Sequence, residues 1–221
     1  MNFLDRRPRR PITQAMRDSV LEDLPELADL ADEELLRKCI EGWAYALAET
    51  SFERVSSLPG EANPGMFALK RGTQAEHLRG VTRTALAIAD DFLRSFPECN
   101  ISRDIIIAGG LMHDVGKCWE FEPANRARWT GDPSETGSPS LRHPTYGAHI
   151  CITVGLPEEI VHIALAHSHE GELLTRSLEC LIVQRADHLW WAVAGACGLL
   201  KPESNHILES RKIAPRALLA D

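Results

Sequence analysis

Histidine and aspartate side chains recur on the apolar faces of the segments that are patterned most clearly as helices. His113 and Asp114 lie within the most apolar stretch of the chain. His77 shares a helical face with Val81, and His167 follows an apolar stripe in its own segment. Because residues three and four apart line one face of a helix, these polar groups are predicted to point inward. Such a chain needs a fold in which the buried polar groups meet.

The apolar pattern of the whole chain predicts an all-α fold. Apolar residues recur at helical intervals, which places helices at about 32–52, 73–96, 102–117, 144–154, 157–168 and 173–197. Residues 56–72 are predicted to be a connector, and no strand is predicted. Residues 118–142 form the longest irregular stretch, and a loop of that length is often a functional lid. We therefore expect a helical bundle of about seven helices.

Composition limits the partners and the cellular setting that we expect. The formal net charge of −8 repels phosphate backbones, so binding to long nucleic acid is not expected. No apolar run reaches the ~20 residues that span a bilayer, and the N-terminus lacks the apolar core of a signal peptide. The six cysteines form no CxxC pair and are interpreted as reduced thiols. We expect a cytoplasmic protein without membrane contact, and a homodimer stays open as its assembly.

The inward-facing His and Asp residues have two interpretations. A hydrogen-bonded core pair of His113 and Asp114 would be a purely structural feature. However, His77, His167 and Asp187 also lie on apolar helical segments. A buried carboxylate needs a partner or a cation. Imidazole and carboxylate ligands suit divalent cations, and helical bundles build two-metal sites from inward side chains, so the recurrence favours a metal site.

Four short segments resemble, in order, the HD-domain superfamily of metal-dependent phosphohydrolases. They are Glu76-His77, Leu111–Lys117, Arg142–Gly147 and Ile182–Leu189, within roughly residues 70–195. The resemblance implies an HD-domain helical bundle with the metal site at its centre.

The chain is expected to be one domain with extensions on both sides. A flexible basic arm is predicted over residues 1–18, where Arg6, Arg7, Arg9 and Arg10 cluster. An N-terminal helical extension and connector would occupy 19–69, packed outside the metal-binding bundle. The HD metal-binding domain would cover 70–200, and a tail would cover 201–221.

The resemblance also implies a role for each matching residue. The first metal would be held by His77, His113, Asp114 and Asp187. Asp114 would bridge to a second metal, held also by His143 and His167. Because both of these extra histidines are present, two divalent ions are expected. Fe or Mn is favoured over Mg, Ni, Co or Zn in so histidine-rich a site.

The choice between two neighbouring histidines stays open in the sequence. Many relatives with two metals carry adjacent histidines where this chain reads Ala166-His-Ser-His-Glu170. Either His167 or His169 could be the ligand, and His167 is preferred because it lies on the apolar stripe. His169 and Glu170 would then face the substrate.

Positive charges near the expected metal site are candidates for anion binding. Lys117 follows the His113-Asp114 pair and is the predicted cation for a substrate phosphate or carboxylate, so Asp114 and Lys117 form the predicted catalytic pair. Three arginines could clamp an anion in a bidentate manner, and Arg176 is placed ahead of Arg71 and Arg142.

Three functions compete at this point. The resemblance implies a hydrolase that cleaves a phosphoester or phosphoanhydride bond of a small anionic molecule, most simply a nucleotide, by attack of a metal-bridged hydroxide. A di-iron oxygenase that cleaves a C–C or C–P bond would have the same ligand pattern. A non-catalytic metal- or ligand-binding regulatory module is the third alternative, and the presence of every expected ligand weakens it. Metal content, phosphate release and oxygen consumption would separate the three.

Overall fold

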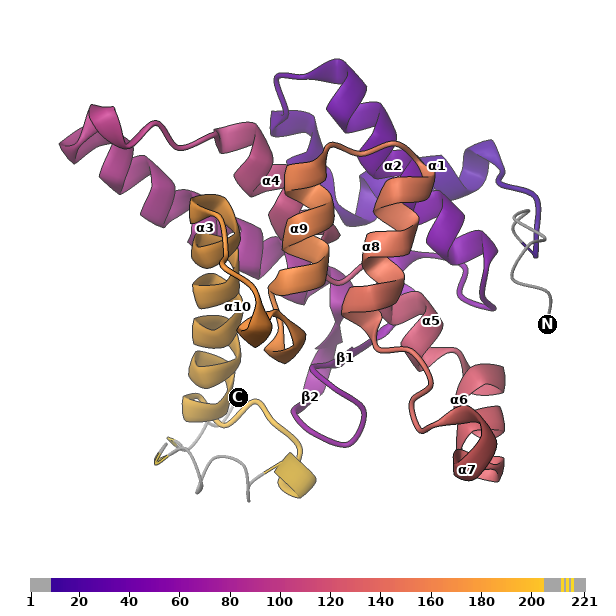
Figure 1. Ribbon diagram of the computed structural model, residues 1–221. Coiled ribbons are helices and arrows are strands. Elements are labelled where there is room, and N and C mark those ends of the chain that lie inside the picture. Colours follow the sequence, from indigo (N-terminus) through magenta and orange to yellow (C-terminus); the bar gives the residue numbers. More distant parts are fainter. Residues whose placement is uncertain (1–8, 205–211, 213, 215, 217–221) are drawn as a thin grey trace.

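The computed structural model describes residues 9–204, 212, 214 and 216. Within them the chain forms a helical bundle with one small two-stranded hairpin, so the predicted all-α class is confirmed (Figure 1). The long helices are α1 (Gln14–Asp23), α2 (Glu33–Ala48), α3 (Gln74–Ser95), α4 (Arg103–Met112), α8 (His143–Thr153), α9 (Glu158–Ala166) and α10 (Leu178–Ala196). Shorter helices are α5 (Lys117–Phe121), α6 (Pro123–Gly131) and α7 (Pro133–Thr136). The strands β1 (Pro59–Glu61) and β2 (Ala68–Thr73) pair in antiparallel fashion.

Single 3-10 turns connect many of these elements. They are η1 (Pro25–Asp29), η2 (Val55–Ser57), η3 (Pro97–Cys99), η4 (His169–Leu173) and η5 (Pro202–Ser204). None of the described helices is both long and apolar enough to span a bilayer. All six cysteines are free thiols.

The helix predicted over 102–117 is broken in the structure. α4 ends at Met112, and α5 begins only at Lys117. Gly116 lies so close to the start of α8 that a Cβ atom there would collide with the carbonyl oxygen of His143. The tight turn that results carries His113 and Asp114, so the break places both side chains at the centre of the bundle.

Two segments that were predicted to be irregular are ordered. The predicted long loop at 118–142 is wrong for most of its length, because α5, α6 and α7 occupy it. The connector at 56–72 contains the hairpin, although no strand was predicted there. Strand β1 is so short that no alternation of side chains could reveal it. Figure 1 shows the hairpin between α10 and the α5–α7 segment.

Part of the predicted N-terminal arm forms a helix. α1 begins at Gln14, capped by the Thr13 side chain, so the prediction of a flexible arm is wrong for residues 14–18. Arg10 donates hydrogen bonds to the carbonyl oxygens of Leu47 at 2.8 Å and Phe52 at 2.6 Å. Arg6 and Arg7 lie outside the described residues. At the other end, the Lys201 amide donates to the carbonyl oxygen of Ala68 at 2.8 Å, while most of the remaining tail also lies outside them.

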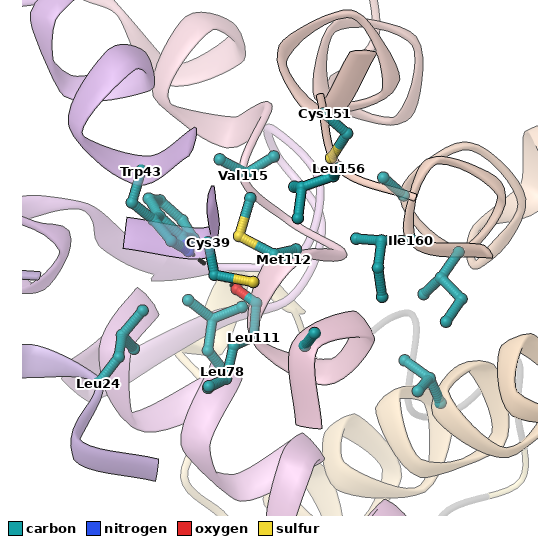
Figure 2. Packing of buried hydrophobic residues seen from close by; sticks show 14 of the residues in the cluster. Leu24, Cys39, Trp43, Leu78, Leu111, Met112, Val115, Cys151, Leu156 and Ile160 are labelled. Carbon is teal, nitrogen blue, oxygen red and sulfur yellow. Dashed lines mark hydrogen bonds between the residues drawn. The ribbon is translucent and has the colours of Figure 1, made fainter. Parts of the chain in front are cut away.

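One hydrophobic core runs through the N-terminal helices and the rest of the bundle. Trp43 of α2 is fully buried, and its indole N–H donates to the carbonyl oxygen of Leu111 in α4 at 2.9 Å. Figure 2 shows Cys39 and Trp43 packed beside Leu78 and Met112. Removal of these apolar side chains from water is the main favourable contribution to the free energy of folding. The core therefore contains side chains from both sides of the predicted boundary between residues 69 and 70, and α2 packs directly against α4 and α8.

Candidate metal centre and its cavity

The six predicted ligand residues meet around the central helix α4. His77 lies in the first turn of α3, and His113 and Asp114 lie in the turn after α4. His143 begins α8, His167 directly follows α9, and Asp187 lies in the middle of α10. Helix α4 contacts α3, α9 and α10. The start of α3 is fixed by a capping box, in which Thr73 and Glu76 satisfy each other's backbone amides. The bundle thus places one or two ligand-type side chains from each helix in a common interior.

One oxygen of the Asp114 carboxylate faces two histidines. The Nε2 atoms of His77 and His113 each lie 3.3 Å from Asp114 Oδ2. His77 Nε2 also lies 3.3 Å from Asp187 Oδ1. Four atoms that could donate an electron pair to a metal therefore surround one small interior volume. They are His77 Nε2, His113 Nε2, Asp187 Oδ1 and Asp114 Oδ2, and we call such atoms donors below.

The other oxygen of the same carboxylate faces a second pair of histidines. His143 Nε2 lies 3.2 Å from Asp114 Oδ1, and His167 Nε2 lies 3.5 Å from it. The two Nε2 atoms are 3.3 Å apart. Asp114 consequently stands between two groups of donors, one at each oxygen.

The donors fit divalent cations. Among the described residues, buried polar atoms without a hydrogen-bond partner include His77 Nδ1 and Nε2, His113 Nε2 and Asp187 Oδ1. Burying such atoms without a partner costs free energy, so their convergence indicates a ligand that supplies the missing interaction. Imidazole nitrogens and carboxylate oxygens are suitable donors for divalent transition metals.

The charge states of these groups also fit cation binding. Burial raises the pKa of Asp114, but the charges of Lys117 and His113 outweigh burial and hold it well below its usual range. Burial likewise raises the pKa of Asp187, but the close contact with His77 and the nearby His113 imidazole lower it by more. Burial lowers the pKa of His143, which Glu120 opposes only in part. At neutral pH the carboxylates are therefore anionic and the His143 imidazole is neutral, as metal ligation requires.

Backbone carbonyls orient two of the histidines. His113 Nδ1 lies 2.8 Å from the carbonyl oxygen of Gly110, and His167 Nδ1 lies 3.0 Å from that of Ala164. Because a carbonyl oxygen only accepts, Nδ1 carries a proton in both rings, so that in the neutral imidazole the lone pair of Nε2 faces Asp114.

Two buried residues at the centre were not predicted from the sequence. Gln74 Nε2 donates to Asp114 Oδ2 at 2.7 Å. Glu120 Oε2 accepts a hydrogen bond from His143 Nδ1 at 2.5 Å. A helical signal existed for both, since Gln74 precedes His77 by one turn and Glu120 follows Lys117 by one turn. For Glu120 the signal was missed because residues 118–142 were predicted to be a loop.

A cavity of about 500 Å³ opens beside the donor groups. Its floor includes Asp114, Lys117, His143, His167 and Asp187. One wall is formed by the loop between β1 and β2 with α10, through Ala62, Asn63, Met66, Phe67 and Trp191. The cavity thus joins an ionic floor to a partly apolar wall, which is the usual character of a small-molecule site.

The predicted substrate-contacting residues fall into two groups. Lys117, His169 and Glu170 all line the cavity. The Lys117 ammonium lies 2.9 Å from Asp114 Oδ2 and donates to the carbonyl oxygen of Glu61 at 2.7 Å. His169 is exposed at the cavity mouth, whereas His167 is buried among the donors.

Arg176 is the predicted residue that the structure does not bring to the cavity. Its guanidinium donates to the carbonyl oxygens of Ala166 at 2.7 Å and Ser168 at 3.1 Å, and it also pairs with Glu172. These bonds stabilise the backbone between α9 and η4. Arg142 lines the cavity instead. The position of Arg176 in the sequence does not show that backbone carbonyls occupy its guanidinium, and its role in anion binding stays a prediction.

An ion-pair network joins the cavity wall to its floor. Arg142 donates to Glu170 at 2.9 Å, to Glu120 at 2.7 Å and to the side-chain oxygen of Asn63 at 2.8 Å. Burial raises the pKa of Glu170, but its hydrogen bonds from Ser168 and Arg142 lower it to about 2. Glu170 is thus ionised throughout the physiological range.

Comparisons with known proteins agree with this geometry. The family model of the HD domain matches residues 75–191, which include all six central residues. The chain is 30% identical over 176 residues to the dihydroneopterin 2′,3′-cyclic phosphate phosphodiesterase of Methanocaldococcus jannaschii, an alignment that covers 76% of this chain and 67% of that protein. No solved structure gives a significant match. Members of the HD family bind divalent metals, and the chain belongs to this family of metal-dependent phosphohydrolases.

Proposed function

We propose that this protein hydrolyses a cyclic phosphodiester of nucleotide size at a centre of two divalent cations. His77, His113, Asp114 and Asp187 would hold one cation, and His143 and His167 would hold the other together with Asp114. Fe or Mn suits these ligands best, because imidazole predominates. The nucleophile would be a water activated by the cations, which also neutralise the charge that develops on the phosphate.

The observation that carries the proposal is the position of Asp114 between two groups of donors. Its Oδ2 atom lies 3.3 Å from the Nε2 atoms of His77 and His113, while its Oδ1 atom lies 3.2 Å from that of His143. A bridging carboxylate of this kind is how a helical bundle holds two cations close together. A site for one cation would not account for the position of His143 and His167 beside Asp114 Oδ1.

The other cavity residues supply binding and orientation. Lys117 would donate to a phosphate oxygen, because its ammonium already lies at the cavity floor beside Asp114. His169 and Glu170 would contact the substrate at the mouth, and the bond between Arg142 and Glu170 would keep this side of the mouth in place. Holding the phosphate against the reacting group in this way removes the entropic cost of their encounter.

The size and lining of the cavity support the substrate class. About 500 Å³ lies within the range of about 300–1,000 Å³ that is usual for small-molecule sites. Phe67 and Trp191 are stacked in the wall with ring centroids 5.9 Å apart, so an apolar ring system would contact apolar surface there. The archaeal relative is named for a 2′,3′-cyclic phosphate of a pterin, which combines a ring with a cyclic phosphodiester.

Free thiols and the acidic composition support the remaining expectations. Four of the six cysteines are buried, and burial raises the pKa of the Cys151 thiol to about 12. Such thiols are inert packing groups, in accord with the reducing cytoplasm that we propose as the setting. The net charge of −8 argues for a small anionic substrate held by local cations rather than long nucleic acid.

The proposal is tested by metal analysis of the purified protein, followed by a substrate panel. Two equivalents of Fe or Mn are expected, and 2′,3′-cyclic phosphates should be opened to phosphomonoesters without oxygen consumption. Asp114→Ala should abolish turnover. Oxygen consumption without phosphoester cleavage would instead indicate the oxygenase. A purified protein that retains no metal, together with wild-type behaviour of Asp114→Ala, would indicate a regulatory module.

A further inference from the structure

Glu120 is a fully buried carboxylate with a specific arrangement of partners. It lies on α5, and both of its oxygens are used. Oε2 accepts from His143 Nδ1 at 2.5 Å, and Oε1 accepts from Arg142 at 2.7 Å. One carboxylate thus fixes two consecutive residues at the start of α8. A buried carboxylate is tolerated only when its lone pairs are satisfied in this way.

The bond to Glu120 distinguishes His143 from the other central histidines. His113 and His167 are backed by main-chain carbonyls. His77 Nδ1 has no hydrogen-bond partner. Only for His143, among these four, does an acidic side chain accept the Nδ1 proton. An anionic acceptor makes the opposite nitrogen more electron-rich than a carbonyl does, and it also fixes the ring orientation.

The orientation that results is directed at one group of donors. With its proton held at Nδ1, His143 presents Nε2 at 3.2 Å from Asp114 Oδ1 and 3.3 Å from His167 Nε2. No hydrogen bond or ion pair joins Glu120 to His77, His113 or Asp187 of the first group. The influence of Glu120 is therefore confined to the second group.

We propose that Glu120, acting through His143, is the positioning residue that sets the affinity of the second cation position. This inference rests on the proposed two-cation centre. Arg142 completes the arrangement, because its charge balances Glu120 while its other nitrogens bind Glu170 and Asn63 at the cavity wall. Arg142 thereby connects Glu120 to the wall of the cavity.

Glu120→Gln tests this with little change of volume. A glutamine offers one acceptor oxygen where His143 and Arg142 each donate a proton, so one of the two bonds must be lost. We expect the second equivalent of Mn²⁺ to bind about 10- to 100-fold more weakly, the usual effect of removing an acceptor behind a metal-ligating histidine. The first equivalent should keep the wild-type dissociation constant within about twofold.

The measurement is equilibrium dialysis of the full chain against graded Mn²⁺, with bound metal counted at each concentration. Glu122→Gln is the matched control. Glu122 is also buried and directly follows α5, but it accepts from the Ser51 amide at 2.7 Å and the Ser51 hydroxyl at 2.9 Å, away from the centre. It should bind both equivalents as the wild type does. His143→Ala should lose the second equivalent and keep the first.

The outcomes separate this inference from the proposed function. Two equivalents with unchanged affinity in Glu120→Gln would overturn the inference and leave the two-cation centre standing. Equal weakening of both equivalents would also overturn it, since that indicates general loss of structure. Binding of one equivalent by the wild type would overturn the centre itself and the inference with it. If Glu120→Gln does not fold, Glu120→Asp is the alternative, because it keeps the negative charge but moves the carboxylate away from His143. Wild-type affinity for the second equivalent in that variant would overturn the inference.

Discussion

The donor groups around Asp114 and the wall of the adjoining cavity are built in different ways. The ligand-type residues lie on helices or directly beside them, and His113 and His167 are oriented by main-chain carbonyls of their own helices. The wall is a short hairpin loop, and it is tied to the floor by hydrogen bonds between residues distant in the sequence, such as Arg142 with Asn63. This difference indicates that the ligand-type residues can be recognised from the local sequence, whereas the shape of the cavity depends on contacts between distant segments. If so, substitutions at the donors should abolish the reaction, and substitutions in the wall should alter substrate binding.

Asp114→Ala is expected to have the largest effect. It removes the carboxylate shared by both donor groups, so neither cation would keep its ligands. Because metal catalysis supplies several kcal/mol, kcat should fall by about 10³-fold or more. Metal content and kcat measured on one preparation check this. Retention of two equivalents together with near-normal turnover would contradict the role given to the carboxylate.

Lys117→Met tests the residue that joins the two regions. Lys117 contacts both Asp114 and the carbonyl oxygen of Glu61 in the hairpin. Methionine keeps much of the volume and removes the charge, so kcat/KM should fall by about 100-fold, as for loss of one donor to a transition-state oxygen. Steady-state kinetics on a cyclic phosphate provides the measurement. If kcat/KM stays within twofold, Lys117 has no part in phosphate binding.

Asn63→Ala tests the wall alone. It removes the acceptor of the 2.8 Å bond from Arg142 while leaving every donor group in place. Loss of one such bond should raise KM by about tenfold with little change in kcat, because a charged hydrogen bond contributes about 1.5 kcal/mol. Metal content should stay at the wild-type level. Loss of metal in this variant would show that the cavity wall also contributes to cation binding.

Glu170→Gln gives the smallest expected effect, a change in the pH dependence of stability. The pKa of Glu170 is lowered in the folded protein from 4.5 to about 2. A lowered pKa stabilises the folded state above 4.5, and this contribution is lost as the pH falls from 4.5 toward 2. Because the side chain is 30% exposed, solvent screening reduces the contribution to about 1 kcal/mol.

Urea unfolding at pH 7 and at pH 3 measures this contribution. The wild type should be more stable than Glu170→Gln at pH 7, and the difference should shrink at pH 3. Glu98→Gln, at an exposed position outside the site, serves as the control and should show no such trend. A difference that is the same at both pH values would indicate that ionisation of Glu170 does not stabilise the fold.

The successes and failures of the sequence-based predictions follow the same division. Periodic apolar residues predicted the positions of α2, α3, α8 and α9 closely. The pattern is clearest in α3, which buries one face and exposes the other. The hairpin at 59–73 was missed, since its strands pair with each other over a few residues and carry no periodic signal. The short helices α5 and α6 were missed in a segment rich in Pro and Gly, where tertiary contacts such as the stacking of Trp119 on Tyr146 stabilise the chain.

By itself the sequence determined the helical class, the family and the residue types that gather around Asp114. The family follows from the resemblance of four short segments. The helical class and the inward residue types depend on helical spacing and on the free energy of burying polar groups, which are local properties of the chain. Only the tertiary structure decided that His167 rather than His169 lies among the donors, that Arg142 rather than Arg176 lines the cavity, and that Glu120 supports His143. Each of these depends on contacts between segments that are distant in the sequence, and such contacts form only when the helices pack.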